Sequence, residues 1–239
     1  ILSKGKKHTK KFINTPFKRK EISSNKGTIN FTITENLFNK HSEFQHIEIV
    51  KTKRFGRTLL IDNDINVTEL DEKNYHEMIV HVPMAYKLNA KKALIIGGGD
   101  GGTARELLKY KNLDVTMIEI DKVVIEAAKL HLPSTAISYQ NPRLNLIIDD
   151  GAKFIKNYSG EKFDIIIVDS TDFNRAIVLF TKEFYTNIFN NLKEDGVLVF
   201  NNDSVVNDEH SLILNPTNQL KKIFKFVFPY QLFMPSYYS

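Results

Sequence analysis

The sequence predicts an α/β fold in which a doubly wound parallel sheet follows a small N-terminal antiparallel β domain. Beyond residue 71, five short apolar runs alternate with segments of helical periodicity, which is typical of strands joined by crossover helices. These runs are too apolar for half-exposed strands and therefore indicate strands that helices cover on both faces. Before residue 71, apolar and polar residues alternate over short segments, which predicts antiparallel strands.

Length and composition are those of a soluble globular enzyme. The chain has 239 residues, of which 42% are hydrophobic and 26% are charged, so it can bury one core and a small second domain. No run approaches the ~18 consecutive apolar residues of a membrane span, and the N-terminus does not resemble a signal peptide, so we expect a cytoplasmic protein. The absence of cysteine excludes disulfides, thiolate zinc sites and a cysteine nucleophile.

The net charge of +5 comes from the N-terminal end of the chain. Eight of the 33 lysines and arginines lie in residues 1–20, where no acidic residue occurs. The other residues hold 25 basic against 28 acidic side chains, a net charge of −3, so nucleic acid is not an expected partner. We expect residues 1–27 to form a flexible, solvated basic arm.

Residues 28–70 are predicted to form the N-terminal β-sheet domain. The segments TINFTIT, FQHIEIVKT and GRTLLID alternate in polarity and are separated by turn residues. From Asp71 onward apolar residues recur at helical spacing up to Pro83, so we expect a helix that links this domain to the next one.

Residues 71–239 are predicted to form the parallel-sheet domain. The order of strand and helix segments is that of a doubly wound sheet. The expected strands are 93–96, 115–120, 144–148, 163–168 and 197–200, and the expected helices between them are 103–110, 123–131, 152–157 and 181–192.

Acidic residues follow four of these strands in succession. In a sheet of this kind ligands bind beyond the carboxyl ends of the strands, so the residues just after each apolar run are the candidates for a site. A lone aspartate there is usually a solvated loop residue, but four acidic strand ends together indicate a binding site. They are Asp100 in GGGDGG, Glu119 and Asp121 in EID, Asp149 and Asp150 with Gly151 in DDG, and Asp169 and Asp172 in DSTD.

The charge of Asp100 decides which ligand this glycine-rich turn accepts. Glu119 lies 22 residues after Gly97, close to the ~20 expected of an acidic residue that binds a ribose, so an adenosine group is indicated. A glycine-rich turn alone serves dinucleotides, S-adenosyl compounds and simple tight turns alike. A phosphate or amino-acid carboxylate beside Asp100 would be repelled, whereas a cationic group would be attracted. The residues therefore favour adenosine with a positive, carboxylate-free arm, and a second cation near Asp169 and Asp172.

These motifs, together with TELDEKNYHEMIVHVP upstream, resemble those of the spermidine synthases, the polyamine aminopropyltransferases. The resemblance runs from about residue 44 to 237. It implies a Rossmann-like, methyltransferase-type fold and transfer of the aminopropyl group of decarboxylated S-adenosylmethionine to a diamine such as putrescine, which yields spermidine and methylthioadenosine. It also implies that neither a metal nor another cofactor is needed, and that the chain forms a homodimer or homotetramer.

The resemblance also assigns roles to single residues. On the nucleoside side it implies that Glu119 binds the ribose and that Gln45, Asp150 and Gly151 contact the nucleoside. On the amine side it implies that Asp169 is the proton acceptor. The other residues implied to bind the amine are Tyr75, His76, Asp172 and Tyr237, and Asp100 is implied to bind the co-substrate at its aminopropyl arm, or the polyamine.

The reaction requires a base near the attacking amine. An alkylammonium group has a pKa of ~10.4 and must lose a proton before its nitrogen can attack, whereas a free aspartate, with a pKa of ~3.9, is a poor base. We therefore expect burial and the proximity of Asp172 to raise the pKa of Asp169.

Several departures from the family pattern fall on the amine side. The loop over residues 173–176 lacks the usual proline and glycine and carries Arg175, and Asn66, Asn201 and Asp203 are shorter than or different from the usual residues. The chain also ends before the family's final strand region, so a C-terminal truncation is expected. Two alternatives therefore stay open: a non-catalytic paralogue that binds nucleosides or polyamines, and an S-adenosylmethionine-dependent methyltransferase, which Asp100 disfavours.

Overall fold

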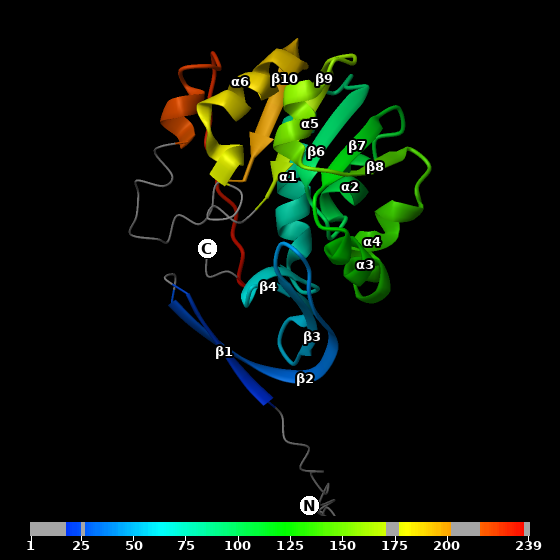
Figure 1. The fold of residues 1–239 in the computed structure, drawn as a ribbon, viewed down its shortest axis with the longest axis vertical. Helices are drawn as coiled ribbons and strands as arrows, with labels where there is room; N and C mark the ends of the chain where they lie inside the picture. The colour runs from blue at the N-terminus through cyan, green and yellow to red at the C-terminus, as the bar shows by residue number, and fades with distance from the viewer. Residues whose placement is uncertain (1–17, 25–26, 171–176, 202–215, 237–239) are drawn as a thin grey trace, which may run out of the picture.

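The structure is a computed structural model that describes residues 18–24, 27–170, 177–201 and 216–236. Two five-stranded sheets form its two parts, the first with strand order β1-β2-β3-β4-β5 and the second with order β10-β9-β6-β7-β8. The first sheet lies at one end of the elongated molecule, and the second sheet with its helices forms the larger part (Figure 1). The predicted fold class is confirmed.

Every pair of neighbouring strands in the N-terminal sheet is antiparallel. The prediction of a flexible arm over residues 1–27 is wrong for its last part, because residues 18–24 form a strand that pairs with residues 27–33. Main-chain hydrogen bonds form such a ladder whatever the side-chain charge, and lysines are common on edge strands. Residues 1–17 lie outside the described part. The strands are β1 (Lys18–Ser24), β2 (Gly27–His41), β3 (His46–Thr52), β4 (Gly56–Ile61) and β5 (Asp64–Thr68).

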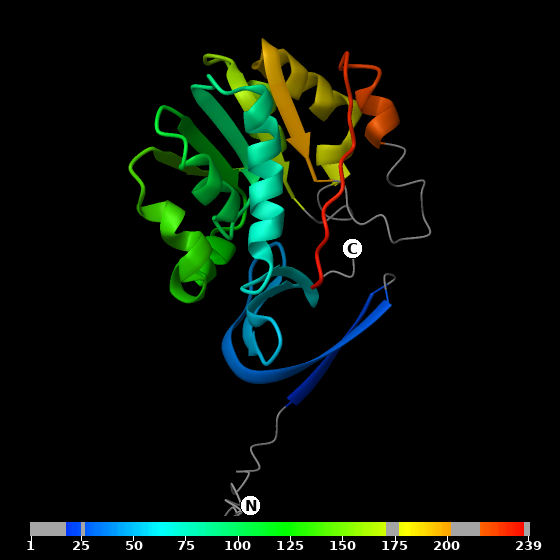
Figure 2. The same ribbon diagram turned by 180° about the vertical axis from the view of Figure 1, so that it is seen from behind.

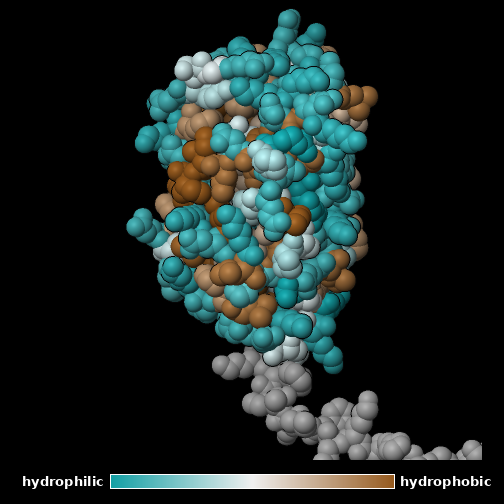
Figure 3. Space-filling view, turned by 90° about the vertical axis from the view of Figure 1, so that its right-hand side faces the viewer, coloured by the Kyte–Doolittle hydropathy of each residue, from teal (hydrophilic) through white to brown (hydrophobic). Residues whose placement is uncertain are grey.

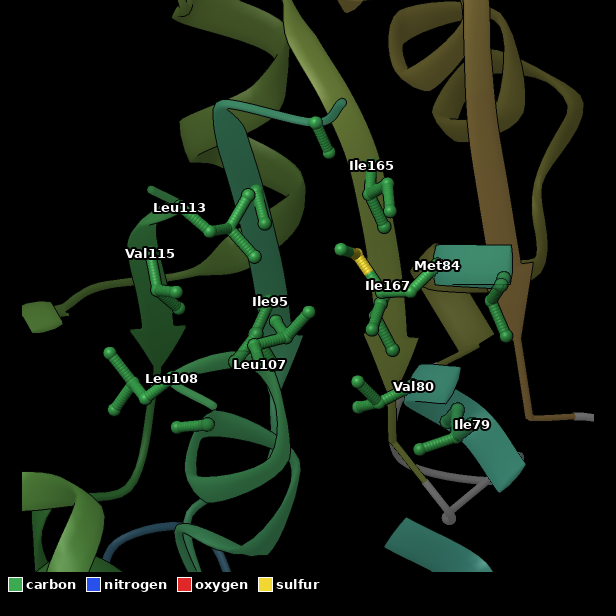
Figure 4. Close-up of a cluster of buried hydrophobic side chains, with 14 of the residues drawn as sticks. Ile79, Val80, Met84, Ile95, Leu107, Leu108, Leu113, Val115, Ile165 and Ile167 are labelled. Atoms are coloured by element: carbon green, nitrogen blue, oxygen red, sulfur yellow. The ribbon is translucent and has the colours of Figure 1, made fainter. Parts of the chain in front are cut away.

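The helix that links the two sheets, α1 (Glu72–Tyr86), is longer than predicted. It continues for three residues beyond Pro83, which has no N–H to donate within the helix. The apolar residues of its inner face, among them Ile79, Val80 and Met84, are buried against the parallel sheet and hold this last turn in place (Figure 4).

The second sheet is wholly parallel, and its strands agree with the five predicted runs. The strand order reverses between β6 and β9, which are hydrogen-bonded neighbours although two strands separate them in sequence. The elements are β6 (Lys92–Gly97), α2 (Gly102–Leu107), β7 (Asp114–Glu119), α3 (Lys122–His131), α4 (Pro133–Ala136), β8 (Leu144–Ile148), α5 (Gly151–Asn157), β9 (Phe163–Asp169), α6 (Lys182–Asn191) and β10 (Leu192–Phe200), with short 3-10 turns at Ile137–Gln140 and Ile177–Phe180.

Alternate residues of the central strands enter two different cores. Ile95 and Ile167 pack with α1 and α2, whereas Leu94, Ile166 and Val168 pack with α5 and α6 on the other face. Figures 1 and 2 show these two helix layers from opposite sides. The period of two follows from strand geometry, because successive side chains point to opposite faces.

Helix α3 packs against the N-terminal sheet. Its residues Val124, Ala127 and Ala128 share a buried cluster with Ile47 and Ile49 of β3. This contact brings the turn between β2 and β3 to the end of β7, where Glu119 lies.

The C-terminal segment runs back along α1, as the red trace in Figure 2 shows. Ser236 donates hydrogen bonds from its backbone N–H and its hydroxyl to the carboxylate of Asp71, at 2.8 and 2.9 Å, and the hydroxyl of Tyr230 donates to the carbonyl of Met78.

Within the described residues, no helix is long and apolar enough to cross a membrane. The face toward the edge strand β8 carries hydrophobic patches among hydrophilic residues (Figure 3).

Candidate active site

The candidate site lies where the strand order of the parallel sheet reverses. Gly97 at the end of β6 is in register with Asp169 at the end of β9, and the N–H of Gly98 donates to the Asp169 carbonyl at 3.0 Å. Gly97 has φ of +87°, and a Cβ atom there would lie 2.3 Å from that carbonyl oxygen. Only glycine permits this close approach, which brings the glycine-rich turn next to Asp169.

The carboxylate of Asp169 is buried and held by two hydroxyl groups. The Tyr75 hydroxyl donates to Oδ1 at 2.5 Å, and the Thr103 hydroxyl donates to Oδ2 at 2.6 Å. Burial raises the pKa of Asp169, and the nearby charge of Asp100 raises it further, while His76 and the two hydroxyl groups oppose the rise. The pKa of Asp169 is therefore raised, as expected from the sequence. The acidic neighbour that contributes is Asp100. Asp172, the neighbour named in the sequence analysis, lies outside the described residues.

Asp100 lies in the turn between β6 and α2, and its position is set by the start of that helix. The N–H of Gly102 donates to Oδ1 of Asp100 at 2.8 Å. The same oxygen lies 3.2 Å from Nε2 of His76. Asp100 is therefore fixed on the side of the turn that faces α1.

The ring of His76 is enclosed between two carboxylates. Its Nδ1 lies 2.6 Å from Oε2 of Glu72, one turn earlier on α1, and its Nε2 faces Asp100 without forming a hydrogen bond. Burial lowers the pKa of His76, but the charge of Asp100 and the contacts with Glu72 and Asp169 outweigh it and raise the pKa to about 10. The ring is therefore an imidazolium cation at neutral pH.

Three acidic or basic side chains converge at this point. One ligand atom from each of His76, Asp100 and Asp169 lies within 4.8 Å of the others. This cluster is not apparent from sequence spacing. A metal ion needs a neutral imidazole, whereas here the two ring nitrogens lie 2.6 and 3.2 Å from carboxylate oxygens, which favours a ring that carries a proton on both nitrogens. The two aspartates instead suit an ammonium group.

A second group of residues lies at the end of β7. Glu119 is buried, and its Oε1 accepts a hydrogen bond from the N–H of Asp121 at 2.8 Å. A Cβ atom on Gly99 would lie 2.9 Å from Glu119 Oε2, so the glycine turn passes directly over this carboxylate. Burial and the charges of Asp121 and Asp169 raise the pKa of Glu119 to about 7.

Asp121 connects Glu119 to the N-terminal sheet. Its Oδ2 accepts hydrogen bonds from the Ser42 hydroxyl at 2.7 Å and from the Gln45 amide at 2.9 Å, while its Oδ1 caps α3 by accepting from the N–H of Val123. The structure thus brings Gln45 to the Glu119 edge of the site through Asp121, a contact that the position of Asp121 among the acidic strand ends did not predict.

Asp150 and Gly151 begin α5 beyond the end of β8. Asp150 caps the helix by accepting hydrogen bonds from the N–H groups of Ala152 and Lys153, at 2.8 and 3.1 Å. A Cβ atom on Gly151 would lie 2.4 Å from Ile96 Cγ2, so a side chain there would collide with β6.

Several residues that the sequence predicts for the site are not among those that the structure brings together there. Asp172, Asp203, Tyr237 and the loop 173–176 lie outside the described residues. Asn66 is on β5, where its amide donates to the Asp64 carbonyl, and Asn201 follows β10 with its N–H bonded to the Val168 carbonyl, one residue before Asp169.

Four residues that the sequence analysis assigned no role contact the site or its supports. Thr103 bonds to Asp169, Tyr139 donates to the Gly99 carbonyl at 2.7 Å, and Glu72 and Arg105 form a buried ion pair behind His76. Thr103 had a signal in the sequence, because it directly follows the glycine turn at the edge of the sheet where the candidate residues gather.

Comparison with known proteins gives matches along most of the chain. The family described as "Spermine/spermidine synthase domain" matches residues 72–239, and the one described as "Spermidine synthase tetramerisation domain" matches residues 19–69. A polyamine aminopropyltransferase of Alkaliphilus metalliredigens (strain QYMF) is 45% identical over 214 residues, which cover 88% of this chain and 75% of the relative. One from Clostridium perfringens (strain 13 / Type A) is 41% identical over 222 residues, covering 92% of this chain and 78% of the relative.

Two solved structures have the same fold at similar levels of identity. A spermidine synthase in complex with the transition state analogue AdoDATO superimposes with a TM-score of 0.80 at 36% identity, covering 83% of this chain and 68% of that one. The spermidine synthase of Thermotoga maritima superimposes with a TM-score of 0.77 at 35% identity, covering 83% of this chain and 67% of that one.

Proposed function

This chain belongs to the spermine/spermidine synthase family, and we propose that it transfers the aminopropyl group of decarboxylated S-adenosylmethionine to a diamine such as putrescine, forming spermidine and methylthioadenosine. The observation that carries the proposal is the pair of buried carboxylates, Asp100 and Asp169, beside the glycine turn. The two carboxylates outnumber the one imidazolium cation of His76 beside them, so this point attracts cationic groups and repels the carboxylate or phosphate that other adenosine ligands carry.

The proposed nucleoside half lies at the ends of β7 and β8. Glu119 is proposed to accept hydrogen bonds from the two ribose hydroxyl groups, since its buried carboxylate lies directly beneath the glycine turn. Gln45, Asp150 and Gly151 are proposed to contact the nucleoside around it. The spermidine synthase structure with bound AdoDATO, which superimposes on this chain, supports the choice of decarboxylated S-adenosylmethionine as co-substrate.

The proposed amine half lies at the ends of β6 and β9. Asp169 is proposed as the proton acceptor, with Tyr75, His76 and Asp100 around the amine and the aminopropyl arm. Asp172 and Tyr237 are proposed to complete this half of the site. Their proposed roles rest on the sequence motifs alone, because both residues lie outside the described part of the structure. Two hydroxyl donors hold Asp169 in one orientation, so its carboxylate does not have to reorganise before proton transfer.

The chemical step needs only a base and an oriented pair of reactants. The ammonium group of the diamine gives one proton to Asp169, and the free nitrogen lone pair then attacks the methylene carbon bound to the sulfonium. The new C–N bond forms as the C–S bond breaks, and the electron pair of that bond leaves on sulfur as neutral methylthioadenosine. The raised pKa of Asp169 narrows the gap to the pKa of the amine and so favours the first proton transfer.

The assembly is proposed to be a homo-oligomer formed through the N-terminal sheet. The match of residues 19–69 to the tetramerisation domain supports a homotetramer over a homodimer. Light scattering after size-exclusion chromatography measures the mass directly, and removal of residues 1–24 is expected to weaken the assembly. The cytoplasmic location and the lack of a nucleic-acid partner stay predictions.

One assay tests the proposed reaction against its alternatives. The purified protein is incubated with decarboxylated S-adenosylmethionine and a panel of diamines and triamines, and the products are identified by mass spectrometry. Spermidine and methylthioadenosine are expected with putrescine. Binding of methylthioadenosine without turnover of any amine would identify a non-catalytic paralogue, and tighter binding of S-adenosylmethionine than of its decarboxylated form would identify a methyltransferase.

A further inference from the structure

We propose that Glu72, held by Arg105, is a positioning residue for the amine half of the site, where it fixes the ring of His76 against Asp100. The proposal rests on the proposed aminopropyl transfer. It concerns two residues behind the site rather than a group that touches the substrate.

The Glu72–Arg105 pair is buried and has a single geometry. Two guanidinium nitrogens of Arg105 donate to the two carboxylate oxygens of Glu72, at 2.8 and 2.9 Å. The side chain of Arg105 is 13% exposed and that of Glu72 is 2% exposed. The other contacts of Arg105 run to Glu106, at 2.8 Å, and to the carbonyl of Ser134, at 3.1 Å. All three guanidinium nitrogens are therefore engaged, and a bidentate pair of this kind fixes both orientation and distance.

Glu72 passes this constraint to His76. The oxygen Oε2 that accepts from Arg105 also lies 2.6 Å from Nδ1 of His76. On the other side of the ring, a Cβ atom on Gly102 would lie 2.2 Å from Cε1, so the imidazole lies flat against the start of α2. The ring is thus held at its edge by Glu72 and at its face by Gly102, and its buried Nε2 points toward Asp100 with no hydrogen-bond partner.

Within the described residues, the titratable groups that face His76 are charged or hydrogen-bonded to a charged group. They are Glu72 and Tyr75 on α1, Asp100 in the glycine turn and Asp169 at the end of β9, with Arg105 reaching the ring through Glu72. Contact with His76 and Arg105 lowers the pKa of Glu72 to about 2 despite its burial. Because Arg105 does not give up its proton, the chain of contacts transmits position and charge rather than protons.

The test compares the wild-type protein with Glu72→Gln, which keeps the shape of the side chain but removes its charge. The catalytic efficiency toward the amine is expected to fall between about tenfold and a hundredfold, since a misplacement of about 1 Å at a positioning contact costs up to about a hundredfold. The affinity for methylthioadenosine is expected to stay unchanged. The pH titration of His76, followed by NMR of its Cε1–H, is expected to move at least about one pH unit lower. Glu77→Gln, an exposed glutamate on the same helix, is the matched control.

A second variant covers the case in which the single change prevents folding. Glu72→Gln with Arg105→Gln removes both charges of the pair together, so neither is left without the other, and Glu106 keeps its contacts with His81 and Lys109. The same loss of efficiency and the same shift in the His76 titration are expected. Arg105→Lys keeps the positive charge but loses the two-pronged guanidinium contact with Glu72. Its catalytic efficiency and its His76 titration are expected to lie between those of the wild type and Glu72→Gln.

An unchanged His76 titration, or unchanged efficiency toward the amine in a folded variant, would overturn the proposal. A wild-type protein that turns over no amine would overturn the proposed function instead. The NMR titration does not depend on turnover, so the two failures are distinguishable.

Discussion

The side-chain amide of Gln45 donates a hydrogen bond to the carboxylate of Asp121 at 2.9 Å, although 76 positions separate the two residues in the sequence. Asp121 also donates its N–H to Glu119, so one aspartate connects the N-terminal sheet to the proposed ribose contact. The proposed nucleoside half of the site therefore spans the boundary between the two sheets.

Replacement of Asp121 by alanine is expected to weaken binding of methylthioadenosine by about tenfold. The change removes the acceptor that holds Ser42 and Gln45 and the cap of α3, and a loss of about 1.4 kcal/mol of binding free energy, the order of one hydrogen bond, is tenfold in affinity. Isothermal titration calorimetry measures the affinity. Asp114→Ala, an exposed aspartate at the opposite end of β7, serves as the control, and equal affinities for the two variants would contradict the assigned role.

Replacement of Asp169 by asparagine is expected to lower kcat between about a hundredfold and ten-thousandfold. The amide keeps the shape of the side chain, and its carbonyl oxygen can still accept from one of the two hydroxyls of Tyr75 and Thr103, while the other hydroxyl turns to accept from the NH2 group. The amide cannot take a proton from the amine. Steady-state kinetics measure kcat, and the affinity for methylthioadenosine is expected to change little. Turnover at the wild-type rate would remove Asp169 from the mechanism.

Replacement of Gly102 by alanine is expected to lower the efficiency toward the amine through His76. The added methyl group would lie within 2.4 Å of both ring nitrogens of His76, so the ring must move away from Asp100. A double-mutant cycle isolates this cause, because in a His76→Ala background the same change has no ring to displace. Kinetics of the four proteins give the coupling, and additive effects would show that the collision is not with His76.

Replacement of Glu119 by glutamine is expected to stabilise the unliganded protein at alkaline pH. The folded protein holds this proton up to a pKa of about 7, whereas the ordinary value is 4.5, so the wild-type free energy of unfolding falls as pH rises between these values. At about 1.4 kcal/mol per unit of pKa, the fall amounts to about 3 kcal/mol.

Chemical denaturation at pH values below 4.5 and above 7 measures this difference. The gain of the glutamine variant is expected above the upper value and absent below the lower one. Glu126→Gln, an exposed glutamate on α3, controls for the loss of surface charge, and a gain of the same size at both pH values would contradict the shifted pKa.

Much of the site was predictable because parallel strands end at one edge of their sheet. Asp100, Glu119, Asp150 and Asp169 each follow an apolar run, and that position alone places them at the same edge of the sheet. The strand β1 was not predictable in this way. Its basic residues indicated a solvated arm, whereas pairing with β2 depends on main-chain hydrogen bonds that leave no mark on composition.

The order of residues along this chain was enough to predict the fold class and the acidic edge of the sheet, and to propose a cationic ligand there, because strand periodicity and residue charge are local properties. It left undecided how the charges are paired. The enclosure of His76 by Glu72 and Asp100, and the contact of Gln45 with Asp121, arise from packing between α1, α2, α3 and the two sheets. Contacts of this kind depend on distances in space, which residue types and their spacing do not specify.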